Sequence, residues 1–386
     1  MTDANRTLWR AAVGMWLLGG VAGVLPAAAL PIFAAREGLS CRTCHVDPSG
    51  GGMRNGFGFE YERARHALVP EMRWPGLPEA QPEPAPGLTV GADLRGIYYG
   101  LNQRDVAGFP DAQSTFIRMQ SALYVAYAPL DRLTLYLNAD LDQPLGPEAW
   151  GLVRFGPDAH AYTRLGSFRI PYGLRLDDHT LYVRRDLPGG GFELLGRGGD
   201  PRTPDTGVEL GWTDRRHTVQ VAITHGAGGR RDGADRNVAV TARASHDLGR
   251  LLAGVTTHLD TDGSGGSAVE RRRYGVYGTL RVTDRLVLLG ELHLAEDTLA
   301  GPETMTRALL GWGEADLFLG RDARLRLRYD YVDTDRDRAL AAAERYAIEV
   351  DLTPLPFVTQ RFAYRYVSSE LGPELDELIA MWHFSF

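Results

Sequence analysis

The stretch Leu133–Asp142, LTLYLNADLD, decides the fold because apolar and polar residues alternate strictly along it. The apolar residues are Leu133, Leu135, Leu137, Ala139 and Leu141, and the polar residues are Thr134, Tyr136, Asn138, Asp140 and Asp142. Successive side chains of a β-strand point to opposite faces of its sheet. A period of two therefore predicts a strand with one apolar face and one polar face.

The same alternation extends from residue 88 to the C-terminus. It recurs in Arg321–Asp333 and in Arg345–Leu352, where arginines and acids occupy polar positions. Strands of roughly 9–11 residues with one apolar face, separated by turns, are typical of transmembrane β-barrels. The pattern predicts about sixteen strands. Their expected ranges are 88–99, 114–127, 131–141, 147–155, 160–169, 205–212, 217–225, 235–246, 250–260, 270–281, 284–295, 304–318, 322–333, 343–352, 356–368 and 376–386.

Three features favour an outer-membrane barrel over a soluble β-sandwich or propeller. Charged residues occupy the polar face of strand after strand, which suits a wet lumen. Connections alternate between short and long, as expected when every short turn faces the periplasm. The chain ends in an amphipathic strand in which Trp382, Phe384 and Phe386 share one face. The predicted fold is therefore an all-β transmembrane barrel of antiparallel strands in the bacterial outer membrane.

Residues 1–29 have the pattern of a secretory signal peptide. Arg6 and Arg10 precede the apolar run 11–25, and the small residues 27–29 follow it. The run is shorter than the ~20 apolar residues of a membrane-spanning helix, and an uncleaved anchor is the alternative. Export would place the two cysteines in an oxidising compartment.

The only two cysteines lie in the motif Cys41-Arg42-Thr43-Cys44-His45. Cys-x-x-Cys-His is the attachment pattern of c-type haem, in which each thiol adds to a vinyl group and the histidine binds the iron. A zinc site would need further ligands, and a thioredoxin-like pair would need a βαβ context that this sequence lacks. The motif predicts one covalent haem c, with Cys41 and Cys44 as thioether positions and His45 as proximal ligand.

The sixth iron ligand has two candidates. The stretch Phe57–Leu68 predicts a short helix that folds back over the haem and offers His66. Met53, which follows the glycines 50–52, is the alternative distal ligand, and an open coordination position is the third option. We favour His66.

Composition divides the exported chain into three parts. Residues 30–74 are the predicted haem segment, with helical structure, residues 75–87 a proline-rich linker, and residues 88–386 the barrel. Chains below about 40 residues usually need a cofactor or partner to fold. We therefore expect the haem segment to lie in or at the lumen, against its walls near the periplasmic mouth. Strand parity places His160 and His383 inward at that mouth.

In the order of its parts the chain resembles the fused cytochrome–porin family. The resemblance rests on a signal peptide, one N-terminal CxxCH motif, the run Asp47–Glu60, DPSGGGMRNGFGFE, after the motif, and a C-terminal porin-like barrel. The best-known members are outer-membrane iron oxidases. The resemblance implies extracellular electron transfer, with Fe(II) as donor and a periplasmic c-type cytochrome as acceptor. Iron as the substrate is implied by the family alone.

Two functions remain open. The first is an electron conduit, in which a lumen haem relays electrons between an extracellular donor or acceptor and a periplasmic cytochrome; covalent haem attachment favours it. The second is a diffusion porin for small anions with a structural or sensory haem plug. Six predicted lumen arginines would select the anions, unless they pair with acids on neighbouring strands. They are Arg118, Arg164, Arg326, Arg328, Arg361 and Arg365.

Charge and loop composition add weaker indications. The net charge of −7 argues against a nucleic-acid partner, whereas outer-membrane lipid is an implied one. Acidic residues of the predicted outer loops could gather cations at the rim. Within the longest predicted loop, Asp177-Asp178-His179 is the best local set of metal ligands.

Overall fold

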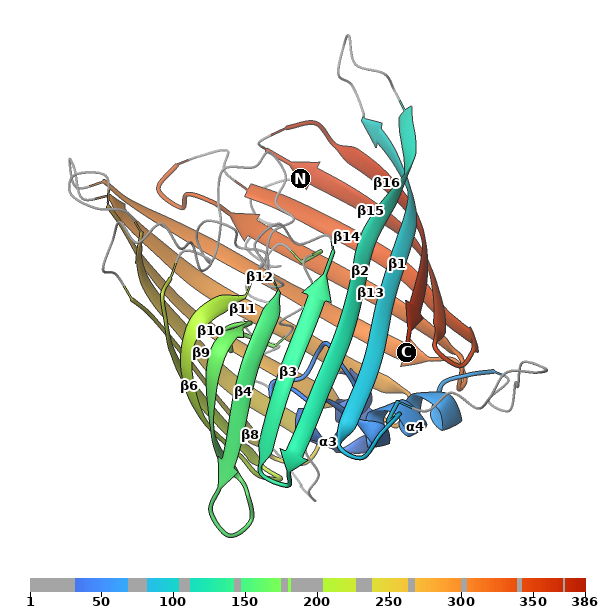
Figure 1. Ribbon diagram of the computed structural model, residues 1–386. Coiled ribbons are helices and arrows are strands. Elements are labelled where there is room, and N and C mark those ends of the chain that lie inside the picture. Colours follow the sequence, from blue (N-terminus) through green and yellow to red (C-terminus); the bar gives the residue numbers. More distant parts are fainter. Residues whose placement is uncertain are drawn as a thin grey trace.

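The structure is a computed structural model that describes residues 32–68, 82–103, 112–141, 147–174, 180–181, 204–226, 238–262, 268–299, 304–338, 342–370 and 372–386. Within these residues, sixteen antiparallel strands form one closed barrel (Figure 1). Each strand pairs with its sequence neighbours, and β16 closes against β1. The predicted fold class is confirmed, whereas the predicted signal peptide lies outside the described residues.

The strands follow the predicted ranges closely. They are β1 Leu88–Gln103, β2 Ala112–Leu130, β3 Leu133–Asp140, β4 Glu148–Phe155, β5 Ala161–Phe168, β6 Asp205–Thr213, β7 His217–Thr224, β8 Ala239–Asp247, β9 Leu251–Asp262, β10 Val269–Arg281, β11 Leu286–Leu299, β12 Thr304–Phe318, β13 Ala323–Asp333, β14 Ala342–Leu355, β15 Val358–Ser369 and β16 Leu375–Ser385.

Apolar and polar residues face opposite sides of the barrel wall, as the alternation predicts. On β3, Leu135 and Leu137 remain 46% and 43% exposed on the outer face, whereas Tyr136 and Asn138 are buried inside. On the last strand, Trp382 and Phe384 are exposed on the outside. An apolar outer band with a polar interior is the arrangement that lets a closed sheet span lipid.

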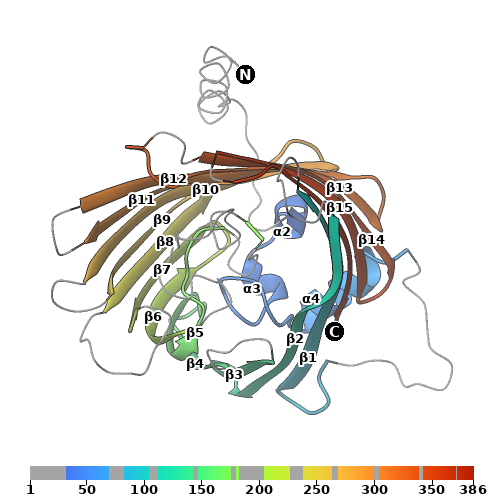
Figure 2. The ribbon, with the colours of Figure 1, turned by 90° about the horizontal axis from the view of Figure 1, so that it is seen from above.

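Three short helices precede the barrel: α2 Ile32–Glu37, α3 Cys41–Cys44 and α4 Gly56–Arg65. No helix in the described part of the chain is long and apolar enough to cross a membrane. Figure 2 shows α2 and α3 inside the ring of strands, with α4 at its edge beside the C-terminus. The predicted helix 57–68 is therefore present but ends earlier, with His66 as its C-cap.

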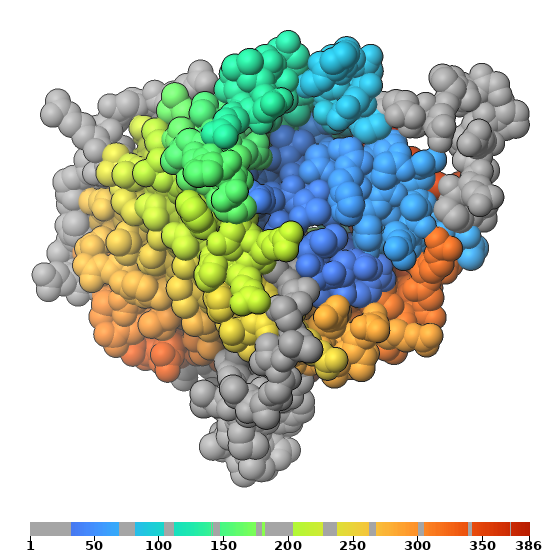
Figure 3. All heavy atoms as spheres, turned by 90° about the horizontal axis from the view of Figure 1, so that it is seen from below, coloured from blue at the N-terminus to red at the C-terminus, as the bar shows by residue number. Residues whose placement is uncertain are grey.

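Residues 32–68, here called the plug, lie at the mouth of the barrel that carries the short turns and the C-terminus. We call this end of the barrel the near mouth. The backbone N–H of Leu68 donates to the Thr353 carbonyl near the end of β14, and Arg54 bonds Ser385 on the last strand. Figure 3 shows this near mouth from below, with plug atoms filling the space between wall atoms. The plug thus lies in the lumen, where the sequence places it.

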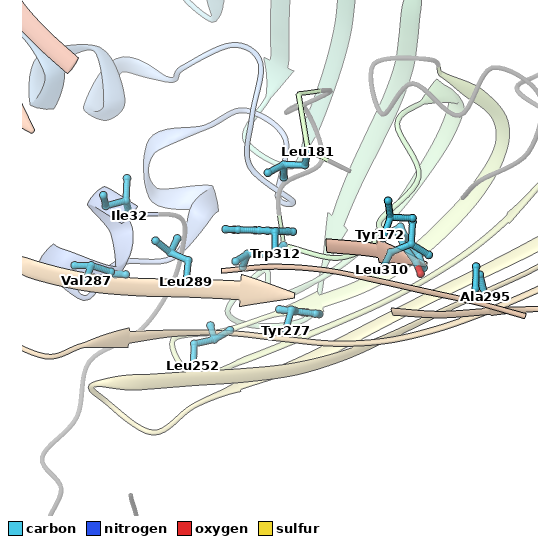
Figure 4. Packing of buried hydrophobic residues seen from close by; sticks show 14 of the residues in the cluster. Ile32, Tyr172, Leu181, Leu252, Tyr277, Val287, Leu289, Ala295, Leu310 and Trp312 are labelled. Carbon is cyan, nitrogen blue, oxygen red and sulfur yellow. The ribbon is translucent and has the colours of Figure 1, made fainter. Parts of the chain in front are cut away.

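Two hydrophobic clusters line opposite parts of the lumen. The first lies mainly on β9–β14 and takes in Ile32 and Ala35 of the plug, with Phe33 and Cys41 packed against it (Figure 4). The second lies on β2–β7 and takes in Met53 of the plug. We call these two regions the β9–β14 wall and the β2–β7 wall.

Candidate functional site

The two cysteines lie on one helical turn inside the lumen. Helix α3 spans Cys41–Cys44, and the N–H of His45 donates to the Cys41 carbonyl at 3.0 Å. The two sulfurs are not joined in a disulfide. Burial, and after it the neighbouring Cys41, raises the pKa of the Cys44 thiol to about 11. The turn therefore presents two thiols and an imidazole in sequence, as the motif predicts.

Helix α4 is tied directly to this turn by Asn55. The Asn55 side chain donates to the carbonyls of Arg42 and Thr43 at 3.3 and 3.1 Å, and its carbonyl oxygen accepts from the N–H of Gly58 at 3.0 Å. A Cβ at Gly58 would lie 2.1 Å from the Cys44 carbonyl oxygen. Only glycine lets the two backbones approach this closely.

The glycine run after the motif folds back onto the first cysteine. Gly50, Gly51 and Gly52 all have positive φ, a conformation that costs other residues free energy. A Cβ at Gly50 would lie 3.1 Å from the Cys41 sulfur. These glycines therefore give the loop its tight path around one of the two thiols.

His66 lies at the far end of α4 in an apolar setting. Its ring packs against Phe33, with ring centroids 3.9 Å apart, and against Tyr61 at 4.9 Å. Burial, helped by Arg36 and other arginines, lowers the pKa of His66 to about 3. Its Nε2 is buried and makes no hydrogen bond within the described residues. A neutral imidazole with an unused nitrogen is the form that binds a metal.

Met53 lies on the other side of the plug. Its side chain is 3% exposed and packs into the cluster of the β2–β7 wall. By contrast, Cys41 and Phe33, the ring that His66 stacks on, pack against the β9–β14 cluster. The structure thus groups His66 with the first cysteine through a shared cluster, and separates Met53 from that cluster.

The two predicted inward histidines both lie beside the plug. Arg42, inside the CxxCH motif, bonds His160 Nδ1 at 3.1 Å. His383 Nε2 bonds Asp93 Oδ1 at 2.7 Å. Each histidine is therefore tied to a charged neighbour, and His160 contacts the motif directly.

Sequence reasoning missed the polar contacts that hold the plug. Asp47 accepts from buried Arg164 at 2.6 Å, and the Gln220 amide donates to Ser49 at 2.7 Å. Arg54 forms an ion pair with Glu62 inside the plug. The polar residues just after the motif were the available signal, since a short segment needs partners for its buried polar groups.

At least five of the six predicted lumen arginines pair with acids. Arg164 bonds Glu209 at 2.6 Å; Arg326 bonds Glu314 and Glu349 at 2.7 Å each. The remaining pairs are Arg328–Asp330 at 3.1 Å, Arg361–Asp351 at 2.6 Å and Arg365–Glu349 at 3.0 Å. Arg118 is exposed. These five arginines are therefore paired with acids of the same or a neighbouring strand and do not form an open row of positive charge.

The described residues contain no cluster of three or more metal-binding side chains. Asp177-Asp178-His179 lies outside the described residues. Of the acidic positions near the outer rim, Asp297 pairs with Arg273 at 2.5 Å and Asp335 with Arg338 at 3.0 Å. Each of these two carboxylates therefore already forms an ion pair with an arginine.

The plug residues fit a covalent haem c. Two cysteines on one turn, a histidine directly after them, and a buried histidine nitrogen without a hydrogen bond form a suitable donor set. Cys41 and Cys44 would hold the porphyrin, His45 would bind the iron from one side, and His66 is the better-placed candidate for the other.

Comparisons with known proteins support the fold. The structure is similar to an anion-selective porin from Comamonas acidovorans, with a TM-score of 0.61 and 12% identity over 78% of this chain and 99% of that one. It is similar to OmpT of Vibrio cholerae, with a TM-score of 0.58 and 11% identity over 79% and 100%. It is also similar to the outer-membrane channel DcaP of Acinetobacter baumannii, with a TM-score of 0.56 and 12% identity over 79% and 99%. No family model and no curated protein matches the chain.

Proposed function

We propose that this chain is an outer-membrane channel of the porin type whose periplasmic mouth is closed by a haem-bearing plug. The similarity to porins and channels supports the channel part better than it supports an electron conduit. One observation carries the plug part: residues 32–68 contact the wall on several sides of the near mouth. Asp47 bonds β5, Arg54 bonds β16, and Leu68 bonds the end of β14.

A plug fixed in this way restricts passage through the lumen. Its polar anchors are buried, so displacing it would break the buried ion pair between Asp47 and Arg164 and leave Arg164 with Glu209 alone. The paired lumen arginines do not support a selective path for anions. The proposed channel is therefore mostly closed while the plug is in place.

Conductance in planar bilayers tests this proposal. The full chain should show low conductance, and a variant without residues 32–68 should show large, stable open-pore currents. Equal, large currents from both would contradict the plug. Equal, negligible currents from both would contradict the channel.

The haem c on Cys41 and Cys44 remains a proposal that rests on the motif and its turn. When bound, it would supply a one-electron redox centre within the lumen. Asn55 and Gly58 would hold the attachment turn against α4, and the neutral imidazole of His66 would face the iron without competing for a proton. Replacing both cysteines with Ala should abolish haem staining of the denatured band, provided that the host matures c-type cytochromes.

A second candidate function is electron transfer across the outer membrane. The position of the motif inside the lumen at the near mouth favours it, because a periplasmic cytochrome could approach the attachment turn there. Fe(II) as an extracellular donor rests on the family resemblance alone. Reduced-minus-oxidised haem spectra of intact outer membranes should respond to added Fe(II) if this function holds, and should stay unchanged if it does not.

A further inference from the structure

A cavity of about 560 Å³ lies at the near mouth, between the plug and the wall. The plug contributes Arg36, Glu37 and Arg65 to its lining. The ends of the wall strands contribute Arg281, Asp284, Arg285 and Arg321. Five guanidinium groups thus share one concave space with two carboxylates.

Two wall arginines are fixed by the plug helices. Arg281 donates to the carbonyl of Arg36 at 2.8 Å, and Arg321 donates to the carbonyl of Ala64. These carbonyls belong to the last turns of α2 and α4, where helices lack internal donors and favour positive charge. Each guanidinium has five N–H donors, so both arginines keep donors available to the cavity.

The plug side of the cavity is also ordered. The Arg36 guanidinium packs over the Phe318 ring, 4.3 Å from its centroid, and bonds the Glu37 carboxylate at 3.0 Å. Glu37 also accepts from the Tyr61 hydroxyl at 2.7 Å. The acid nearest the plug arginines is therefore already engaged, and it offers them limited further compensation.

Two arginines have no comparable contact. The side chains of Arg65 and Arg285 are exposed, and within the described ranges neither makes a direct side-chain hydrogen bond or ion pair, although Arg65 lies near enough to Glu37 to help lower the pKa of that carboxyl. Arg65 belongs to the plug and Arg285 to the β10–β11 turn. An excess of arginine in a concave site matches the bidentate geometry of phosphate and carboxylate groups.

We propose that this cavity binds a small polyvalent anion bearing phosphate or carboxylate groups. Because its arginines come from both plug and wall, such an anion bridges the two. Binding only to the docked arrangement stabilises that arrangement through mass action. The bridging step rests on the proposed plug; the binding step does not.

Titration calorimetry on the full chain in detergent tests the binding step, with tripolyphosphate and citrate as separate probes. We expect saturable binding of one anion per chain, and the preferred probe identifies phosphate or carboxylate as the recognised group. The double variant Arg65→Gln/Arg285→Gln should bind about 10- to 100-fold more weakly, because two charge-assisted contacts are lost.

The matched control is Arg132→Gln, an exposed arginine in the β2–β3 turn that does not line the cavity. It should leave the affinity unchanged. Absence of saturable binding by either probe, or an equal loss in the control, overturns the proposed site.

Hydrogen–deuterium exchange tests the bridging step separately from conductance and from haem. Saturating anion should slow exchange in α4 and in the β10–β11 turn together. Protection confined to the turn, with α4 unchanged, would retain the site but overturn the bridge. Because neither readout uses ion flow, a failure here is distinct from a failure of the channel proposal.

Discussion

The two walls of the lumen use buried arginine in different ways. On the β2–β7 wall, Arg164 reaches out of the sheet and divides its bonds between Asp47 of the plug and Glu209 of the neighbouring strand, at 2.6 Å each. On the β9–β14 wall, Arg326 of β13 bonds Glu314 and Glu349, which belong to the two neighbouring strands. Both arginines are fully or almost fully buried. The network of Arg164 joins the plug to the barrel wall, whereas the network of Arg326 stabilises the wall alone.

Removing Arg326 should give the largest loss of barrel stability. Arg326→Met leaves the buried carboxylates of Glu314 and Glu349 without this guanidinium. Removing one partner of a buried ion pair typically lowers the free energy of unfolding by about 3–5 kcal/mol. Urea unfolding in detergent should show the loss, while bilayer conductance stays low because the plug contacts remain. A variant with normal stability but open-pore currents would reverse the assigned roles of the two networks.

Removing the charge of Asp47 should mainly affect the plug. Asp47→Asn weakens the bond to Arg164, which keeps Glu209, so we expect a cost of about 1–3 kcal/mol in plug docking. The conductance of single channels should rise or become intermittent, with barrel unfolding nearly unchanged. Asp351→Asn, which removes a carboxylate paired within the sheet, is the control and should not open the pore.

Most of the barrel was predictable from the sequence, because the alternation of apolar and polar residues that defines each strand is a property of neighbouring residues. The alternation at Leu135 and Tyr136 sets which face meets lipid, and the structure confirms it. The partner of Arg164 was not predictable in this way. Asp47 lies 117 residues away, and no periodicity connects a plug loop with a strand. The sequence therefore indicates that an arginine faces the lumen, but not what it binds there.

In the plug, too, local features were predictable from the sequence, whereas contacts between distant residues were not. The CxxCH spacing predicts that both cysteines share one turn, and α3 has that form. The predicted helix after it was too long, since Asn55 caps its start and the chain leaves the helix at His66. The role of Gly58 becomes visible only when α4 lies against the Cys44 carbonyl, because a glycine in a helix has no distinct sequence signature.

Gly58 offers a test of how closely the attachment turn depends on α4. Gly58→Ala places a Cβ 2.1 Å from the Cys44 carbonyl oxygen, so α4 must move, at a cost of about 1–3 kcal/mol. We expect less haem per folded barrel, measured as haem staining against protein. The control is Gly56→Ala in the same helix, where the nearest atom to the new Cβ is 3.6 Å away. Equal haem loading in both variants would show that α4 does not support the attachment turn.

The last test concerns the sixth ligand of the iron, for which the plug offers one candidate beside each wall. His66 stacks on Phe33 beside the β9–β14 cluster, and Met53 is buried in the β2–β7 cluster. His66→Ala should convert a six-coordinate haem spectrum to a five-coordinate or water-ligated one. Met53→Ala should leave the spectrum unchanged and lower only the free energy of unfolding, by about 2–5 kcal/mol, because it opens a cavity. His160→Ala and His383→Ala should give smaller spectral shifts, since both histidines already have charged partners. If Met53→Ala changed the spectrum and His66→Ala did not, the sixth ligand would be Met53, the plug residue that packs against the β2–β7 wall. Asp47 is anchored to the same wall.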